Sequence, residues 1–194
     1  MGLPLRKADR IYTYGDYRTW PEDERWELIE GTAWNMSPAP GRFHQKISIE
    51  FSAIIRNFLR GKDCEVYAAP FDVLLPALGE EEEDEVTTVV QPDISVICDR
   101  KKLTEKGCTG APDFIIEILS PHTAMKDIDI KRRLYERHGV REYWIADGGN
   151  RFIHLYVLGE DGKYSAEPAV YVSGDKVKST VLEGLSIDLD ELFQ

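Results

Sequence analysis

The sequence has few cysteines and no long apolar run, and each absence excludes a class of protein. Cys64, Cys98 and Cys108 are odd in number among the 194 residues and show no CxxC spacing. That pattern argues against a zinc knuckle or a disulfide framework and favours a reducing compartment. No stretch of about 18 apolar residues exists, so no membrane-spanning helix is expected. Residues 1–10 lack the apolar segment of a signal peptide. We therefore expect a cytoplasmic protein.

Basic residues are scarce relative to acidic ones. The net charge is −11, and residues 80–85 alone contribute six acids, which leaves −5 for the rest of the chain. This balance excludes a broad, non-specific nucleic-acid coat. The acidic run lacks the alternating oxygen donors and the glycine turn of a calcium loop, so we expect it to be solvated. Basic clusters at residues 100–102 and 131–133 are either solvated surface or local basic patches.

The apolar pattern predicts strands that alternate with helices. Residues 42–60 predict an amphipathic helix, and Thr123 is a good N-cap for a second helix that ends at His138. The length suits a single domain over residues 1–194, of class α/β (α+β), in which helices flank a central sheet. The expected strands are an N-terminal hairpin at 26–31 and 32–36, a strand pair or one bent strand at 65–75, strands at 87–98, 113–119 and 142–146, and a C-terminal hairpin at 151–158 and 164–172.

Two of these strands carry a single carboxylate inside an apolar run. Asp93 lies in Gln91–Ile97, and Glu117 lies in Phe114–Leu119. A carboxylate in a buried strand is costly to hold ionised without a cation or strong hydrogen bonds. On neighbouring strands the two could share a divalent metal, and hard carboxylate oxygens suit Mg²⁺ or Mn²⁺. Asp113 cannot join Glu117 at one metal, because four residues along a strand span roughly 13 Å.

Four further polar residues lie near these strands or on the faces of the helices that are expected to cover them. Lys131 falls on the apolar stripe of the second helix and is either a lysine whose head reaches water or a cation aimed at the carboxylates. In the latter case a metal and a lysine together suit phosphodiester hydrolysis. His44 lies at the edge of the first helix's apolar face, where histidines are usually structural. Glu50 flanks the same stripe and is a second candidate for an acid that faces inward. Glu30 lies beside the Gly31 turn, and its spacing favours a solvated side chain.

Several short motifs, in their order along the chain, resemble those of one nuclease family. Pro92-Asp93 with Glu117-Ile118-Leu119 resembles the signature of the PD-(D/E)XK nuclease superfamily, except that Leu119 replaces the expected lysine. The ordered set is similar to the Uma-type putative restriction endonuclease family, formerly a domain of unknown function. The matching segments are Glu27-Leu28-Ile29-Glu30-Gly31, Ser37-Pro38, His44-Gln45, Gln91-Pro92-Asp93, Glu117-Ile118-Leu119-Ser120-Pro121, Asp127, Lys131 and Gly139-Val140-Arg141-Glu142-Tyr143-Trp144-Ile145.

The resemblance implies a restriction-endonuclease-like fold with a mixed central sheet and a core over about residues 26–158. It implies a Mg²⁺- or Mn²⁺-dependent DNA endonuclease in which Asp93, Glu117 and Glu30 hold the metal. Lys131, displaced from strand to helix, would assist the attacking water. Glu30 stands where the family more often has Asp, and Glu50 remains a rival to it.

Three accessory residues complete the implied site, namely His44, Gln45 and Asp127. His122 stands where the family more often has Ser, a departure that removes no ligand.

DNA as the substrate would require a positive path to the phosphate backbone. We expect it near Lys131 and Arg132, together with the basic cluster at residues 100–102. A homodimer would supply two symmetric sites for two strands, with the C-terminal hairpin as the expected interface.

Two alternatives need no catalysis. One is a catalytically inactive nucleic-acid- or protein-binding domain on the same fold. The other is a structural arrangement in which Lys131 and backbone N–H groups satisfy Asp93 and Glu117.

Overall fold

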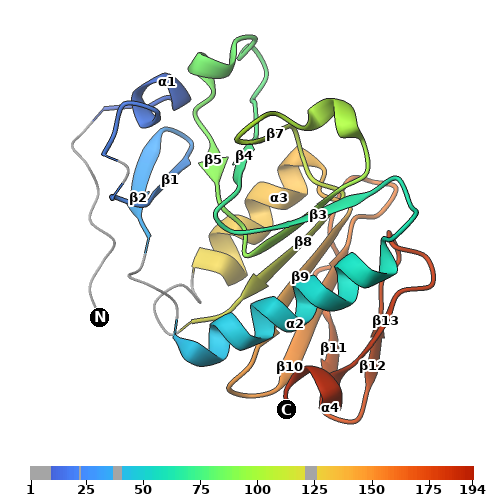
Figure 1. The fold of residues 1–194 in the computed structure, drawn as a ribbon. Coiled ribbons are helices and arrows are strands. Elements are labelled where there is room, and N and C mark those ends of the chain that lie inside the picture. The colour runs from blue at the N-terminus through green and yellow to red at the C-terminus, as the bar shows by residue number, and fades with distance from the viewer. Residues whose placement is uncertain (1–9, 22, 37–40, 121–125) are drawn as a thin grey trace.

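Two larger β-sheets and a small two-stranded sheet organise the chain (Figure 1). The structure is a computed structural model, and it describes residues 10–21, 23–36, 41–120 and 126–194. The six-stranded sheet has the order β11-β10-β9-β8-β6-β3, and the five-stranded sheet has the order β2-β1-β5-β4-β7. The strands are β1 (Trp26–Ile29), β2 (Thr32–Asn35), β3 (Glu65–Ala68), β4 (Asp72–Leu74), β5 (Val89–Val90), β6 (Ile94–Ile97), β7 (Gly107–Thr109), β8 (Phe114–Ile118), β9 (Glu142–Asp147), β10 (Phe152–Val157), β11 (Ala169–Val172), β12 (Lys176–Lys178) and β13 (Ser186–Asp188).

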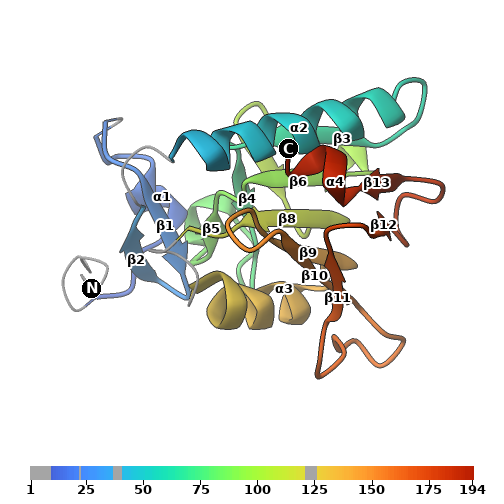
Figure 2. The ribbon, with the colours of Figure 1, turned by 90° about the horizontal axis from the view of Figure 1, so that it is seen from below.

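Helices cover both faces of the six-stranded sheet. Figure 2 shows α2 on one side of β6, β8 and β9, and α3 on the other. The sheet is mixed, because β8 runs parallel to β9 and antiparallel to β6. This arrangement confirms the expected α+β class with a mixed sheet between helices. The helical segments are α1 (Tyr14–Tyr17), α2 (Arg42–Phe58), the 3₁₀ turns η1 (Glu83–Glu85) and η2 (Arg100–Lys102), the π-helical turn η3 (Lys126–Lys131), α3 (Arg132–His138) and α4 (Leu189–Leu192).

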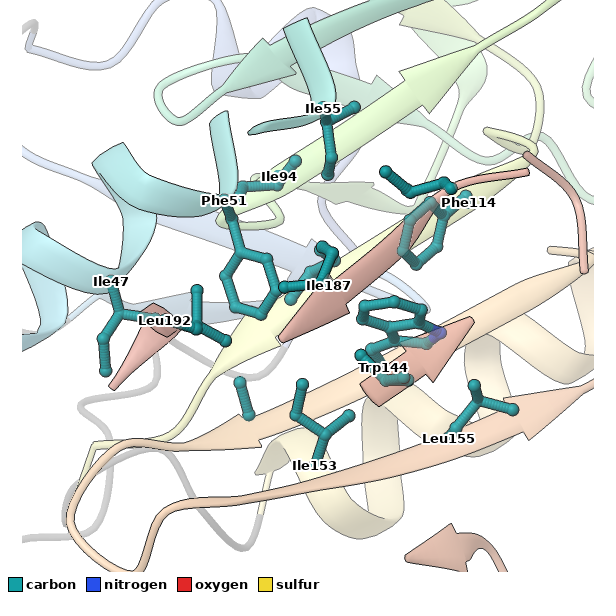
Figure 3. Close-up of a cluster of buried hydrophobic side chains, with 14 of the residues drawn as sticks. Ile47, Phe51, Ile55, Ile94, Phe114, Trp144, Ile153, Leu155, Ile187 and Leu192 are labelled. Atoms are coloured by element: carbon teal, nitrogen blue, oxygen red, sulfur yellow. The ribbon is translucent and has the colours of Figure 1, made fainter. Parts of the chain in front are cut away.

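Strand alternation divides the core between the two faces. Phe114 and Ile116 of β8 pack with Phe51 of α2, whereas Ile115 packs with Leu134 of α3. Glu117 follows the same period and therefore faces α3. Figure 3 shows the α2-side cluster, in which Ile187 and Leu192 from the end of the chain join Trp144 of β9. The buried core thus also draws on residues after Leu158.

Both terminal hairpins form where the sequence predicts them. β1 pairs with β2, and β10 pairs with β11, in each case antiparallel. Thr123 and the Ser37-Pro38 breaker lie outside the described residues. Within those residues, no helix is both long and apolar enough to cross a bilayer.

Residues 65–75 form the strand pair that was one of the two expected alternatives, whereas the single strand expected at 87–98 is broken in two. In both cases the two strands lie in different sheets. β3 belongs to the six-stranded sheet and β4 to the five-stranded sheet, with a cis Ala69–Pro70 peptide bond between them. Likewise, β5 belongs to the five-stranded sheet and β6 to the six-stranded sheet. Gln91, Pro92 and Asp93 therefore form the crossing between the two sheets, and Asp93 stands at the start of β6 rather than inside a buried strand.

A disulfide joins Cys64 and Cys98, and Cys108 is a buried free thiol. The cysteine pattern argued against a disulfide framework and did not indicate this single bond. The β3–β6 register pairs Glu65 with Ile97, so the next residue outward on each strand is a cysteine. A separation of 34 residues in sequence gives no sign of this neighbourhood.

A buried carboxylate attaches the C-terminal segment to the central sheet. Glu142 of β9 is fully buried, and its Oε1 accepts a hydrogen bond of 2.6 Å from the Trp144 indole N–H. Its Oε2 accepts from the Ser179 hydroxyl at 3.0 Å, from the Thr180 N–H and hydroxyl at 2.8 Å each, and from the Val181 N–H at 2.8 Å. The pattern is that of a structural anchor, because every contact belongs to the fold and none faces a cavity.

We predict that Glu142→Gln destabilises the protein. The amide keeps the size of the side chain but places an N–H₂ group against donors, which costs about 2 kcal/mol of unfolding free energy. Urea denaturation measures this change. Exposed Glu160 supplies the matched control, since Glu160→Gln should leave the midpoint unchanged. Equal midpoints for the two variants would contradict the anchoring role.

Candidate active site

The β6–β8 register brings Asp93 and Glu117 together. Ile94 pairs with Ile116, so Asp93 and Glu117 are the next opposed positions of the antiparallel ladder. The Ile118 N–H donates a hydrogen bond of 2.7 Å to Oδ2 of Asp93. Opposed residues on antiparallel strands have Cβ atoms about 5 Å apart. The two carboxylates therefore lie at one end of the sheet, side by side.

Lys131 reaches Glu117 from the α3 side of the sheet. Its Nζ lies 2.7 Å from Oε1 of Glu117 and 3.8 Å from Oδ1 of Asp127, and its side chain is only 3% exposed. Tyr135 of α3 donates its hydroxyl to the same Glu117 oxygen at 2.8 Å. Of the two interpretations open from the sequence, the structure has the lysine head directed at the carboxylates and away from water.

Glu27, and not Glu30, is the third acid of this cluster. Oε1 of Glu27 lies 2.8 Å from Nζ of Lys131 and accepts the Gln91 N–H at 3.0 Å. Glu30 is 60% exposed and pairs with Arg137. The two acids differ in position because Glu27 faces inward from β1, whereas Glu30 occupies the turn after this strand with φ 50°. Glu50 of α2 is also absent from the cavity lining, so neither rival candidate joins the cluster.

A second lysine, Lys126, binds the same acid. Its Nζ lies 2.5 Å from Oε2 of Glu27. Lys126 and Lys131 are five residues apart, which on an α-helix would turn them about 140° away from each other. The π-helical turn η3 has i→i+5 hydrogen bonding and so places such residues on one face. The wide turn thereby allows both ammonium groups to bind one carboxylate.

The charges of the cluster are unevenly compensated. Four carboxyl groups, those of Glu27, Asp93, Glu117 and Asp127, line one cavity with the two lysines, so the cluster carries a formal excess of two negative charges when all four are ionised. Burial raises the pKa of Glu117 to about 8 against the opposing effect of the Lys131 ammonium.

Neighbouring charges outweigh burial in setting the pKa values of Glu27 and Lys131. Burial also opposes ionisation of Glu27, but the ammonium groups of Lys131 and Lys126 outweigh it and lower the pKa of Glu27 to about 2. Burial lowers the pKa of Lys131, and Glu117, Glu27 and Asp127 together raise it well above its usual value. Lys131 is therefore a cation within the cluster.

The three expected accessory residues all line the cavity, although only two touch the cluster. Nε2 of His44 lies 3.1 Å from Oδ2 of Asp93, and Asp127 is the neighbour of Lys131 described above. Gln45 lies one residue further along α2 and is exposed. The desolvation of His44 lowers its pKa, but the contact with Asp93 outweighs this and raises it.

Gln91 holds the crossing segment in place. Its backbone N–H binds Glu27, its side-chain oxygen accepts from Arg25 at 3.0 Å, and its side-chain amide donates to Asp72 at 2.8 Å. One residue thus links the buried acid to an arginine at the cavity wall.

Asp93 and Glu117 fit a hydrated Mg²⁺ better than a closed metal cage. Within the described ranges, no group of three or more His, Cys, Asp or Glu side chains forms a metal site. Mg²⁺, however, usually binds through one or two carboxylates and retains water. All side-chain hydrogen bonds of Asp93 and Glu117 with described groups involve Oδ2 of Asp93 and Oε1 of Glu117, so among the described residues Oδ1 and Oε2 have no such partner. The donor chemistry is therefore suited to the ion.

The expected basic path does not assemble near the cluster. Arg132 contacts Glu136, Arg100 contacts Glu65, and Lys102 binds the Ala111 carbonyl. Instead, Arg25 and Arg56 are the arginines that line the cavity.

Sequence reasoning missed Glu27 and Lys126 for different reasons. Glu27 is a lone acid in the apolar run Trp26–Ile29, the same signal that indicated Asp93 and Glu117, and that criterion could have found it. The π-helical turn that directs Lys126 inward has no comparable signature in the residues.

Three comparisons relate the chain to known proteins. A family model described as "Putative restriction endonuclease" (Uma2) matches residues 14–190. The uncharacterized protein slr1290 of Synechocystis sp. is 25% identical over 182 residues, which cover 92% of this chain and 90% of that protein. A crystal structure from Anabaena variabilis, titled a putative nuclease belonging to DUF820, is similar with a TM-score of 0.73 and 22% identity.

The structural match covers 93% of this chain and 97% of the other, and at this identity it shows the fold. The family model covers most of the chain and includes every residue of the cluster. The chain therefore belongs to the Uma2 family of putative restriction endonucleases.

Proposed function

We propose that this protein is a metal-dependent DNA endonuclease that hydrolyses phosphodiester bonds. The observation that carries the proposal is the contact of Lys131 with Glu117 beside Asp93, at the wall of a cavity of 1070 Å³. Two carboxylates with available oxygens and a buried lysine are the parts that phosphodiester hydrolysis uses. The family description supplies the nuclease class, and DNA is the substrate we assign within it.

Asp93 and Glu117 would hold Mg²⁺ or Mn²⁺ through the oxygens that face away from their hydrogen bonds. A divalent cation would favour the ionised form of Glu117 and would offset the formal excess of two negative charges that the cluster then carries. When bound, it supplies Lewis-acid stabilisation of the charge that develops on the phosphate.

The protein's own groups have separate tasks in this proposal. Lys131, as an ammonium group, orients the attacking water and stabilises the charge on the phosphate oxygens. Glu27 holds Lys131 and Lys126 in position through both of its oxygens. His44 and the Ile118 N–H fix the orientation of the Asp93 carboxylate.

We also propose that two copies associate, so that two sites address two strands. β11 is an edge strand of the six-stranded sheet, and its Val170 and Val172 are exposed apolar side chains. Unpaired edge strands pair readily with a second copy. Residues after Leu158 supply core side chains, so the interface is better tested by point substitution than by truncation.

We expect Asp93 and Glu117, as the proposed metal ligands, to be required for cleavage. Asp93→Asn and Glu117→Gln should each lower Mg²⁺- or Mn²⁺-dependent DNA cleavage at least about 100-fold, because a bound metal contributes several kcal/mol to the reaction. Glu30→Gln should cleave like wild type, since Glu30 lies on the surface against Arg137. Plasmid and oligonucleotide cleavage measures all three, with circular dichroism as the control for folding. Undiminished cleavage by Asp93→Asn would refute the assignment, and DNA binding without turnover in the wild type would favour the inactive binding domain.

The second prediction separates the lysine from the metal ligands. Lys131→Met should lose cleavage by about 100-fold or more because the buried ammonium is gone. Its Mn²⁺ binding, measured by calorimetry, should persist, since removal of a positive charge does not remove a ligand. Asp93→Asn should lose both properties. If Lys131→Met lost Mn²⁺ binding while Asp93→Asn retained it, the proposed roles would be reversed.

The third prediction concerns association. The double variant Val170→Lys, Val172→Lys should be monomeric in light scattering at concentrations where wild type is dimeric, because like charges would face each other across the paired strands. Glu160→Lys controls for the change in net charge. A wild-type monomer at all concentrations would remove the homodimer from the proposal.

A further inference from the structure

The cavity extends well beyond the acidic cluster, along α2. One stripe of this helix lines it, with spacings of three and four residues, and the edge strand β3 forms the opposite wall. Figure 1 shows that α2 and β3 run beside each other, and they are also in contact. We call this part of the cavity the α2–β3 groove. Its lining residues are Gln45, Ser48, Ile49, Ser52, Ala53 and Arg56 from α2 and Val66, Ala68 and Ala69 from the β3 side.

The groove carries a charge that differs from that of the whole chain. The chain has a net charge of −11, yet none of the described groove residues is acidic. Arg56 stands at its far end and Arg25 lines the cavity beside the cluster. Neither arginine forms an ion pair among the described residues, whereas Arg133 and Arg137 on the other side of the sheet are both neutralised by acids. The groove is therefore the part of the cavity that is suited to an anionic chain.

The groove's polar groups are spaced like the units of a polymer. Ser48 and Arg56 lie eight residues apart on this stripe, which is about 12 Å along the helix. Ser52 stands between them, but its hydroxyl donates to the Ser48 carbonyl at 2.7 Å and is therefore not a donor for phosphate. The separation of Ser48 and Arg56 is about twice that of successive phosphates along a nucleic-acid strand. Hydroxyl and guanidinium groups are common phosphate partners. From His44 at the cluster to Arg56, the helix rises about 18 Å, which corresponds to roughly three phosphates.

The size and lining of the cavity favour one strand over two. A volume of 1070 Å³ is near the upper limit of small-ligand pockets, about 300–1,000 Å³, and suits a few nucleotides but not a duplex. Glu117 at its wall is only 4% exposed, so a scissile phosphate must enter the cavity to approach it. Ile49, 67% exposed, offers an apolar surface to the bases. No Phe, Tyr or Trp side chain lines the described cavity, so base stacking contributes little to binding.

We propose that the α2–β3 groove binds a single DNA strand, with its sugar-phosphate backbone along α2 and Arg56 as the distal phosphate anchor. The proposal rests on the proposed function for its substrate class. It adds that the preferred substrate is single-stranded, as at a frayed, displaced or looped segment. Binding is then independent of base sequence and strongly dependent on salt, because phosphate contacts supply most of the affinity.

The test measures binding without hydrolysis. Fluorescence anisotropy of a labelled 12-nucleotide thymidine strand, in EDTA and over a range of salt concentrations, compares wild type with Arg56→Gln and Ser52→Asp. Wild type should bind the single strand more tightly than the same strand in a duplex. Arg56→Gln should reduce the slope of log affinity against log salt by about 0.7, the value for one phosphate contact on a single strand. Ser52→Asp should weaken binding at low salt, because it adds an anion midway along the groove.

A control variant and two contrary results allow strand binding in the groove to be judged independently of DNA cleavage. Arg60 is exposed just beyond the end of α2 and does not line the cavity, so Arg60→Gln should bind like wild type. Equal slopes for Arg56→Gln and wild type, or tighter binding to duplex, would overturn the groove while leaving metal-dependent cleavage intact. Arg56-dependent strand binding by a wild type that never cleaves would support the groove and refute the proposed endonuclease.

Discussion

The buried ion cluster around Lys131 is the interaction on which the site depends. One ammonium group binds Glu117 from the central sheet and Glu27 from the N-terminal hairpin, so it joins two sheets and a helix at one point. Removal of one partner from a buried ion cluster costs about 3–5 kcal/mol, because the remaining charge is left in a poorly polarisable interior. The same contacts that position the lysine therefore also hold β1 against the central sheet.

Buried acids in this protein serve two different purposes. Glu142 and Glu117 are both buried carboxylates in largely apolar strands, Glu142 on β9 and Glu117 on β8. Glu142 accepts hydrogen bonds from neutral donors of the C-terminal segment, so it stabilises the fold. Among the described residues, only Oε1 of Glu117 accepts hydrogen bonds, and the side chain faces a cavity. A buried carboxylate thus indicates chemistry only where the surrounding donors leave part of it available.

The distribution of charge is compatible with the nucleic-acid substrate that we propose for this acidic chain. Surface arginines of α3 are neutralised by acids, whereas Arg25 and Arg56 line the cavity without ion pairs among the described residues. Under the proposals above, these two arginines would attract a phosphate backbone into the cavity and direct a strand towards the cluster. A net negative surface elsewhere limits non-specific binding.

The sequence by itself determined the class of fold, both terminal hairpins, the family and the pairing of Asp93 with Glu117, because apolar periodicity and motif order are local properties of the chain. Only the tertiary structure decided that Glu27, and not Glu30, contacts Lys131, since Glu27 faces inward from a strand and Glu30 occupies a turn. It also decided that Lys126 shares the site, because a π-helical turn rotates it inward. These outcomes depend on which surfaces pack against each other, and that information is distributed over residues far apart in the chain.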